Sequence, residues 1–147
     1  MIAISACLIG VPCRYNGKAA TSKDLMKALK EEELLAFCPE ILGGLPTPRQ
    51  PAEIINGTGI QVLKRERKIF DRLGNDITAA YIKGAYCSLD LLKKHGVKEA
   101  YLKDNSPSCG VTKIYDGSFT QNKINGFGVT AALLNDSGIT VYHELRF

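Results

Sequence analysis

Short apolar runs alternate with segments of helical periodicity along most of this 147-residue chain. Four runs read as buried strands: residues 1–6, 34–37, 99–103 and 139–143. Three segments read as helices: Thr21 or Ser22 to about Glu32, Asp76 or Thr78 to about Lys94, and 129–136. Alternating strands and helices favour a parallel sheet. We therefore expect a single α/β domain over residues 1–147, a three-layer sandwich with a mostly parallel sheet and helices on both faces.

The segment between the second and third strands is predicted less regularly. Residues 39–51 hold four of the six prolines, so we expect a rigid, non-helical loop there, followed by a short turn from Pro51 through AEII. Residues 60–64 and 68–70 alternate well enough to predict a hairpin or an edge pair. A second small hairpin is expected within residues 112–124, around Asp116-Gly117.

Composition excludes several classes of protein. Apolar residues make up 45% and charged residues 23% of the chain, which is ordinary for a globular domain and excludes a disordered or fibrous chain. The net charge of +4 is too weak to indicate nucleic-acid binding. No apolar stretch approaches the ~20 residues of a membrane helix, and the first residues lack the pattern of a signal peptide. We expect a cytoplasmic protein.

Three of the five cysteines follow predicted strands. Cys7 comes after the first strand, Cys38 after the second, and Cys109 in the loop after the third. Carboxyl ends of parallel strands lie at one edge of a sheet, where ligands bind, so these cysteines are candidates for one site. The alternative is that each is a small buried hydrophobic residue, and we adopt that interpretation for Cys87, within a helix. The role of Cys13 stays open.

The kind of metal follows from the donor atoms. No CxxC pair exists, and His95 and His143 are better interpreted as surface or structural residues. Three sulfur donors suit an iron–sulfur cluster or a Cys₃ zinc site. A cubane held by three cysteines leaves one iron open as a Lewis acid.

Four motifs together resemble the 2-thiouracil desulfurase family: SACLIGVPCRYNG, FCPEILGGLPTPRQPAEI, LKDNSPSCG and NGFGVTAALL. The resemblance spans essentially the whole chain. It implies a [4Fe–4S] cluster held by Cys7, Cys38 and Cys109, and removal of sulfur from a thiolated pyrimidine, C=S becoming C=O. It also implies roles in that chemistry for Glu40 and Ser106. Whether aerobic preparations lose the cluster or exchange it for zinc stays open.

The side chains of these residues are chemically suited to such roles, and each also has a structural alternative. Glu40 is a candidate general base, and its structural alternative is a helix-cap or loop carboxylate. Ser106 is a candidate proton relay or substrate contact, and its structural alternative is a turn residue. Arg49, between prolines, is a candidate substrate contact, or else an ion-pair partner of Glu53 or Glu40. Ser108 and Gly126 are further candidate substrate contacts, Gly126 because it precedes a helix N-terminus that offers N–H donors.

The expected partner is a small thiolated base or nucleoside, with no membrane and no strong nucleic-acid signal. The oligomeric state is not determined by the sequence. Two rival functions remain: a non-catalytic zinc- or nucleotide-binding module, and a thiol redox or sulfur-carrier protein that uses Cys7 and Cys13.

Overall fold

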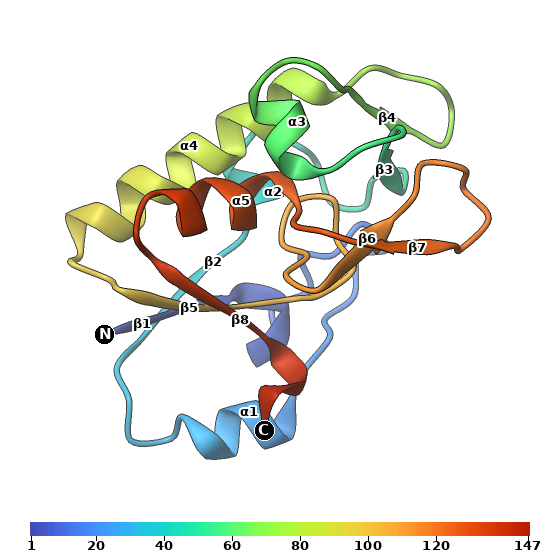
Figure 1. Ribbon diagram of the computed structural model, residues 1–147. Coiled ribbons are helices and arrows are strands. Elements are labelled where there is room, and N and C mark those ends of the chain that lie inside the picture. Colours follow the sequence, from blue (N-terminus) through green and yellow to red (C-terminus); the bar gives the residue numbers. More distant parts are fainter.

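The computed structural model describes residues 1–147 and centres on a four-stranded parallel sheet (Figure 1). The strand order is β2-β1-β5-β8, with bounds β1 Ile2–Ser5, β2 Leu34–Phe37, β5 Glu99–Leu102 and β8 Thr140–His143. All three pairings are parallel, for example Ile4 opposite Ala36 and Tyr101 opposite Tyr142. The four predicted strands and the α/β fold class are confirmed.

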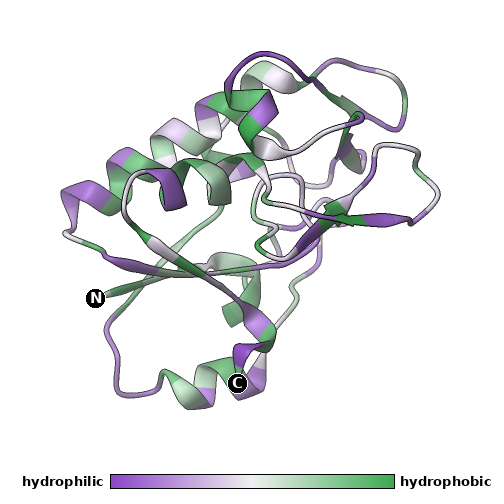
Figure 2. Cartoon of the chain, viewed as in Figure 1, coloured by the Kyte–Doolittle hydropathy of each residue, from purple (hydrophilic) through white to green (hydrophobic).

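Helices cover both faces of this sheet, unequally. α4 (Thr78–Lys94), α5 (Val129–Asp136), α2 (Pro39–Leu42) and α3 (Gly59–Leu63) lie on one side, and α1 (Lys23–Ala28) lies on the other (Figure 1). Alternate strand residues serve the two sides: Ala3 joins the core under α4 and α5, whereas Ile4 packs with Leu25 of α1. Figure 2 shows β1 and most of α5 as hydrophobic, in keeping with their burial.

The segment after β2 differs from the prediction of a non-helical loop. Pro39 occupies the first turn of α2, where its fixed φ suits a helix and its missing N–H costs no hydrogen bond. Cys38 is the N-cap residue, so the helix begins directly after the cysteine. The predicted turn through AEII is also wrong, because Ala52–Ile54 forms strand β3, which pairs antiparallel with β4 (Ile69–Asp71).

The prediction of a strand at residues 60–64 is wrong as well, since this segment is α3. The Gln61 side chain accepts a hydrogen bond from the backbone N–H of Thr58 at 3.0 Å, a capping interaction that favours a helix start. Five residues are too few for the apolar spacing to separate a helix from a strand. α1 ends at Ala28, four residues earlier than predicted.

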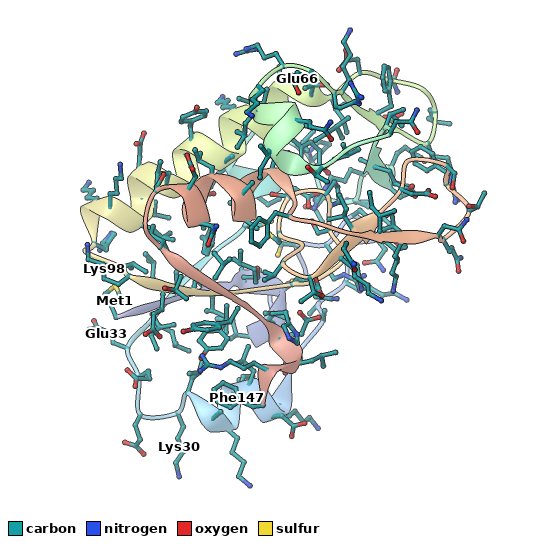
Figure 3. The ribbon with its side chains drawn as sticks, viewed as in Figure 1. Met1, Lys30, Glu33, Glu66, Lys98 and Phe147 are labelled. Carbon is teal, nitrogen blue, oxygen red and sulfur yellow. The ribbon has the colours of Figure 1, made fainter.

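The second predicted hairpin is confirmed. β6 (Lys113–Tyr115) pairs antiparallel with β7 (Lys123–Asn125), and residues 116–122 connect them. Both two-stranded ribbons, β3–β4 and β6–β7, lie beyond the carboxyl ends of the parallel strands (Figure 1). Met1, Glu33 and Lys98, which precede β1, β2 and β5, gather at the opposite edge (Figure 3). The two ribbons therefore cover the carboxyl edge of the sheet, and the residues that precede the strands lie at the other edge.

A glycine pair brings α2 against α4. A Cβ atom on Gly84 would lie 2.1 Å from the carbonyl oxygen of Pro39, and one on Gly43 would lie 2.2 Å from that of Ala80. Both distances are far below van der Waals contact, so only glycine allows the two backbones to approach this closely. The contact fixes the position of α2 relative to α4. No helix of the structure is long and apolar enough to cross a membrane.

Candidate active site

A cavity of about 570 Å³ opens at the carboxyl edge of the sheet. Four of the five cysteines line it: Cys7, Cys13, Cys38 and Cys109. Cys87 does not line it, and lies on α4 with its side chain partly exposed. The edge of the sheet thus gathers cysteines that are up to 102 positions apart in sequence, counted from Cys7 to Cys109.

Each of the three strand-end cysteines sits in a short structured turn. Cys7 lies in a 3₁₀ turn, Ala6–Ile9, that continues β1. Cys38 caps α2, and Cys109 lies in the loop after β5. The hydroxyl oxygen of Ser106 accepts hydrogen bonds from the backbone N–H groups of Ser108, at 3.0 Å, and Cys109, at 3.1 Å. Ser106 therefore holds the Cys109 turn as well as facing the cavity.

The N-terminus of α5 holds the same loop from behind. The N–H groups of Val129 and Thr130 donate to the carbonyl oxygens of Pro107 and Ser108, at 2.8 and 2.9 Å. A Cβ atom on Gly128 would lie 2.5 Å from the carbonyl carbon of Ser108, so glycine is required for this approach. These N–H groups donate to carbonyl oxygens of the protein itself, whereas the sequence had led us to expect that they donate to a ligand.

Burial favours the protonated form of three cavity thiols, those of Cys7, Cys13 and Cys109. It raises the pKa of Cys7 to about 11, with a further contribution from Cys38. Burial, then Cys38, raises the pKa of Cys13 to about 12, and burial raises that of Cys109 well above its ordinary value. Thiolates here need a positive charge that a bound metal would supply.

The donor set of the cavity determines which metal group it fits. No three His, Cys, Asp or Glu side chains are arranged to hold a metal ion. An iron–sulfur cluster binds each thiolate through a different iron atom, and soft sulfur donors from three separate turns suit it. Cys7, Cys38 and Cys109 are such a set, and the residues present therefore fit an iron–sulfur cluster.

The Glu40 carboxylate lies beside these cysteines and is held on both oxygens. Its Oε2 accepts from Arg49 Nε at 2.8 Å and from the Tyr81 hydroxyl at 3.0 Å. Its Oε1 accepts from the Ser106 hydroxyl at 3.4 Å. Burial, followed by the Glu40 charge, raises the pKa of Tyr81 well above its ordinary range, so this hydroxyl stays a donor. Only Oε1 lies on the side of the Cys109 turn.

Arg49 lines the cavity, but its guanidinium is fully occupied by the protein. Besides Nε, its Nη2 contacts Glu40 Oε2 at 2.8 Å and donates to the Cys13 carbonyl at 3.0 Å. Its Nη1 donates to Pro46 O at 3.2 Å and to Thr47 Oγ1 at 3.1 Å. A guanidinium has five N–H donors, so none is left for substrate. Of the two roles that the sequence allowed for Arg49, a substrate contact or an ion pair, the structure shows the ion pair, with Glu40 as the partner.

This ion pair is largely removed from solvent. The Arg49 side chain is 7% exposed and that of Glu40 is 13% exposed. Burial alone would lower the pKa of Arg49, but the Glu40 charge and hydrogen bond outweigh this effect and raise it. Arg49 therefore links three segments: the Cys13 turn, the proline-rich loop and α2.

Two further predicted contacts lie off the cavity wall. Ser108 is 1% exposed and its hydroxyl bonds to that of Thr130 at 2.8 Å, so it serves packing between the Cys109 loop and α5. Gly126 adopts a φ of 154° and packs against the Thr58 side chain. Neither residue is among those that line the cavity. His95 caps the end of α4 and His143 accepts a hydrogen bond near the C-terminus.

Sequence reasoning missed several residues on the cavity wall. Tyr81 lies on the apolar face of α4, and the helical period indicates the place of its ring but not the partner of its hydroxyl. Lys103, at the end of β5, donates to Glu144 Oε1 at 2.9 Å and also lines the cavity. Phe119 and Gln121 reach it from the β6–β7 loop, and no local motif marks them.

Comparison with known proteins agrees with this arrangement. A family model described as 2-thiouracil desulfurase matches residues 2–145. A Bacillus subtilis (strain 168) protein, the uncharacterised protein YbbK, is 48% identical over 144 residues, which is 98% of this chain and 95% of that protein. A solved structure of a [4Fe-4S]-dependent thiouracil desulfidase, TudS, superposes with a TM-score of 0.84 at 41% identity, covering 97% of this chain and 89% of that one. The chain belongs to the 2-thiouracil desulfurase family.

Proposed function

We propose that this protein is a desulfurase that converts the C=S group of a thiolated pyrimidine into C=O, with water as the oxygen donor and sulfide as the second product. The observation that best supports this proposal is that Glu40, a carboxylate bound by Arg49, lines the same cavity as Cys7, Cys38 and Cys109. The family membership and the [4Fe-4S]-dependent relative of known structure support the same activity. A volume of about 570 Å³ lies within the range for small-molecule sites.

In this proposal the three strand-end cysteines hold a [4Fe–4S] cluster. When bound, such a cluster supplies an open iron that acts as a Lewis acid toward a soft thiocarbonyl sulfur. The buried thiols become ligands by losing their protons, which links cluster binding to proton release. Cys13 lines the same cavity but lies outside the set that we propose as ligands.

Glu40 is proposed to take a proton from the water that attacks the thiocarbonyl carbon. Arg49 and Tyr81 both bind Oε2, which leaves Oε1 as the oxygen with free lone pairs. The Ser106 hydroxyl donates to Oε1, so it lies in position to pass a proton between water and the carboxylate or to orient the substrate. The substrate carbon gains the water oxygen and loses sulfur as its bond to sulfur breaks, and the two protons of the water, one of them by way of Glu40, balance the charge of the departing sulfide as H₂S.

Anaerobic reconstitution with iron and sulfide tests the proposal. We expect about four irons per chain, a broad absorption in the blue, and sulfide release from at least one of a panel of thiolated bases and nucleosides. Replacing Cys7, Cys38 or Cys109 with serine should abolish iron binding. Cys87→Ser is the matched control and should retain iron and activity, because Cys87 does not line the cavity.

Two results would contradict this proposal. Stoichiometric zinc without iron uptake, in a protein that turns nothing over, would favour the zinc-binding module. Reversible oxidation of cavity thiols that is unaffected by iron would favour the sulfur carrier. The single domain and the cytoplasmic location expected from the sequence stay predictions alongside this activity.

A further inference from the structure

The loop between β6 and β7 forms a wall of the cavity that the proposed chemistry does not use. Phe119 and Gln121 from this loop line the cavity, together with Tyr115 at the end of β6. The same cavity is lined by Cys38 and Glu40, which lie at the start of α2. A residue with an aromatic ring and a residue with a side-chain amide therefore line the same open cavity as Cys38 and Glu40.

The loop is held in place by a buried carboxylate. Glu53, 8% exposed, accepts hydrogen bonds through Oε1 from the N–H groups of Gly117, at 2.9 Å, and Phe119, at 3.2 Å. Gly117, at a φ of 94°, lies so close to β3 that a Cβ atom would meet the Ile54 carbonyl oxygen at 2.6 Å. The backbone of the loop, at Gly117 and Phe119, therefore docks on β3.

Both wall residues adopt an unfavourable backbone conformation. The φ angles are 57° for Phe119 and 68° for Gln121, in the left-handed region that bulky residues rarely occupy. Such strain persists only where surrounding contacts over-determine it, and the hydrogen bond from the Phe119 N–H to Glu53 is such a contact. Phe119 thus occupies a position where glycine or asparagine would be less strained.

We infer that Phe119 and Gln121 recognise the pyrimidine ring of the substrate; the inference rests on the proposed function and names how the ring is bound. A phenyl ring stacks on the face of any planar base. A side-chain amide both donates and accepts, so Gln121 accepts from the N3–H of the pyrimidine and donates to the neighbouring exocyclic oxygen. N3 lies between the two exocyclic groups, so this pairing suits a sulfur on either side.

The test separates ring binding from desulfuration. Uracil has the same ring and no sulfur, so its binding to cluster-loaded protein, measured by calorimetry, reports recognition of the ring without any contribution from sulfur. Aromatic stacking on a base corresponds to a loss of about 5- to 150-fold on truncation to alanine. We expect Phe119→Ala to weaken uracil binding and raise KM for the thiolated base by that factor, with kcat and iron content nearly unchanged and Phe119→Tyr close to wild type.

Gln121 is tested through N3. Methylation of N3 removes the N–H donor, so 3-methyluracil should bind wild type more weakly than uracil, and this difference should shrink in Gln121→Ala. The matched control is Asn122→Ala, an exposed loop residue that does not line the cavity, which should leave KM and uracil binding unchanged.

The outcomes distinguish this inference from the proposed function. If wild type releases no sulfide from any thiolated base, the proposed function fails, and the uracil titrations still decide whether the wall binds a pyrimidine. An unchanged KM and unchanged uracil binding in Phe119→Ala would overturn the inference, as would an equal loss in Asn122→Ala. Absence of uracil binding to wild type, with the KM of Phe119→Ala unchanged, would overturn it too.

Discussion

Replacing Glu40 by glutamine tests the division of labour between the carboxylate and the cysteines. The substitution keeps the size of the side chain and removes its charge and its capacity as a base. A positioned general base contributes about 10²–10⁴ in rate, so sulfide release should fall by that factor. Because the proposed ligands are untouched, iron content and the visible spectrum should stay as in wild type.

The same substitution has a stability cost that follows from the ion pair. Arg49 is 7% exposed and loses its charged partner. Removing one member of a buried pair costs about 3–5 kcal/mol. Glutamine keeps an acceptor oxygen and Arg49 keeps its bonds to the Cys13 carbonyl and the proline-rich loop, so we expect about 3 kcal/mol. With a urea m-value of about 2 kcal/mol/M, the unfolding midpoint should fall by about 1.5 M.

The assay combines urea unfolding, iron content and initial rates of sulfide release, all under anaerobic conditions. Glu66→Gln is the matched control, because Glu66, labelled in Figure 3, is an exposed carboxylate that does not line the cavity. It should leave all three readouts unchanged. Near-normal desulfuration by Glu40→Gln at full iron content would refute the role of base, and loss of iron would place Glu40 among the supports of the cluster.

Three further predictions follow from the geometry. Gly84→Ala places a Cβ atom against the Pro39 carbonyl, so we expect a loss of about 1–3 kcal/mol by urea unfolding and slower turnover; full stability would contradict the required close approach. Tyr81→Phe removes a donor to the Glu40 carboxylate, and because a hydrogen bond to a charged group contributes about 1.5–3 kcal/mol to stability, the free energy of unfolding in urea should fall by that amount while iron content stays unchanged; full stability would refute this role. Burial raises the pKa of Cys7 to about 11, that of Cys13 to about 12 and that of Cys109 above the ordinary value of 9.0, so the cluster-free, reduced protein should lose stability above about pH 9. Cys7 accounts for about 1.4 kcal/mol per pH unit of this loss up to about pH 11. Urea unfolding across that range should show a decline that is shallower by this amount in Cys7→Ala, and an equal slope in the variant would refute the contribution of Cys7.

Local pattern was sufficient for the framework of this fold. The four parallel strands, the long helix α4 and the helix α5 are visible in the sequence because each presents a run or a period of apolar residues within one segment. The β6–β7 hairpin has a local signal as well, the turn-forming Asp116-Gly117 pair. The gathering of Cys7, Cys38 and Cys109 follows from the same framework, because parallel strands end at one edge.

Short elements escaped prediction for a physical reason. α2 has four residues and α3 has five, so neither completes two turns and neither shows a helical period. Their formation depends on single residues: Pro39 in the first turn of α2, and Gln61 at the start of α3. β3 reads as a turn in isolation and becomes a strand only by pairing with β4.

The chemistry of the site was decided by contacts between distant segments. From the sequence, Arg49 is either a substrate contact or an ion-pair partner of Glu53 or Glu40, and only the fold directs its N–H groups to Glu40 and to the carbonyl of Cys13. Tyr81 is 41 positions from Glu40 and Ser106 is 66 positions from it. A hydrogen bond across such separations leaves no periodic trace in sequence, because it depends on where two segments meet and not on either segment alone. The residue types at the edge of the sheet were therefore readable from the chain, whereas the partner of each polar atom came only from its packing.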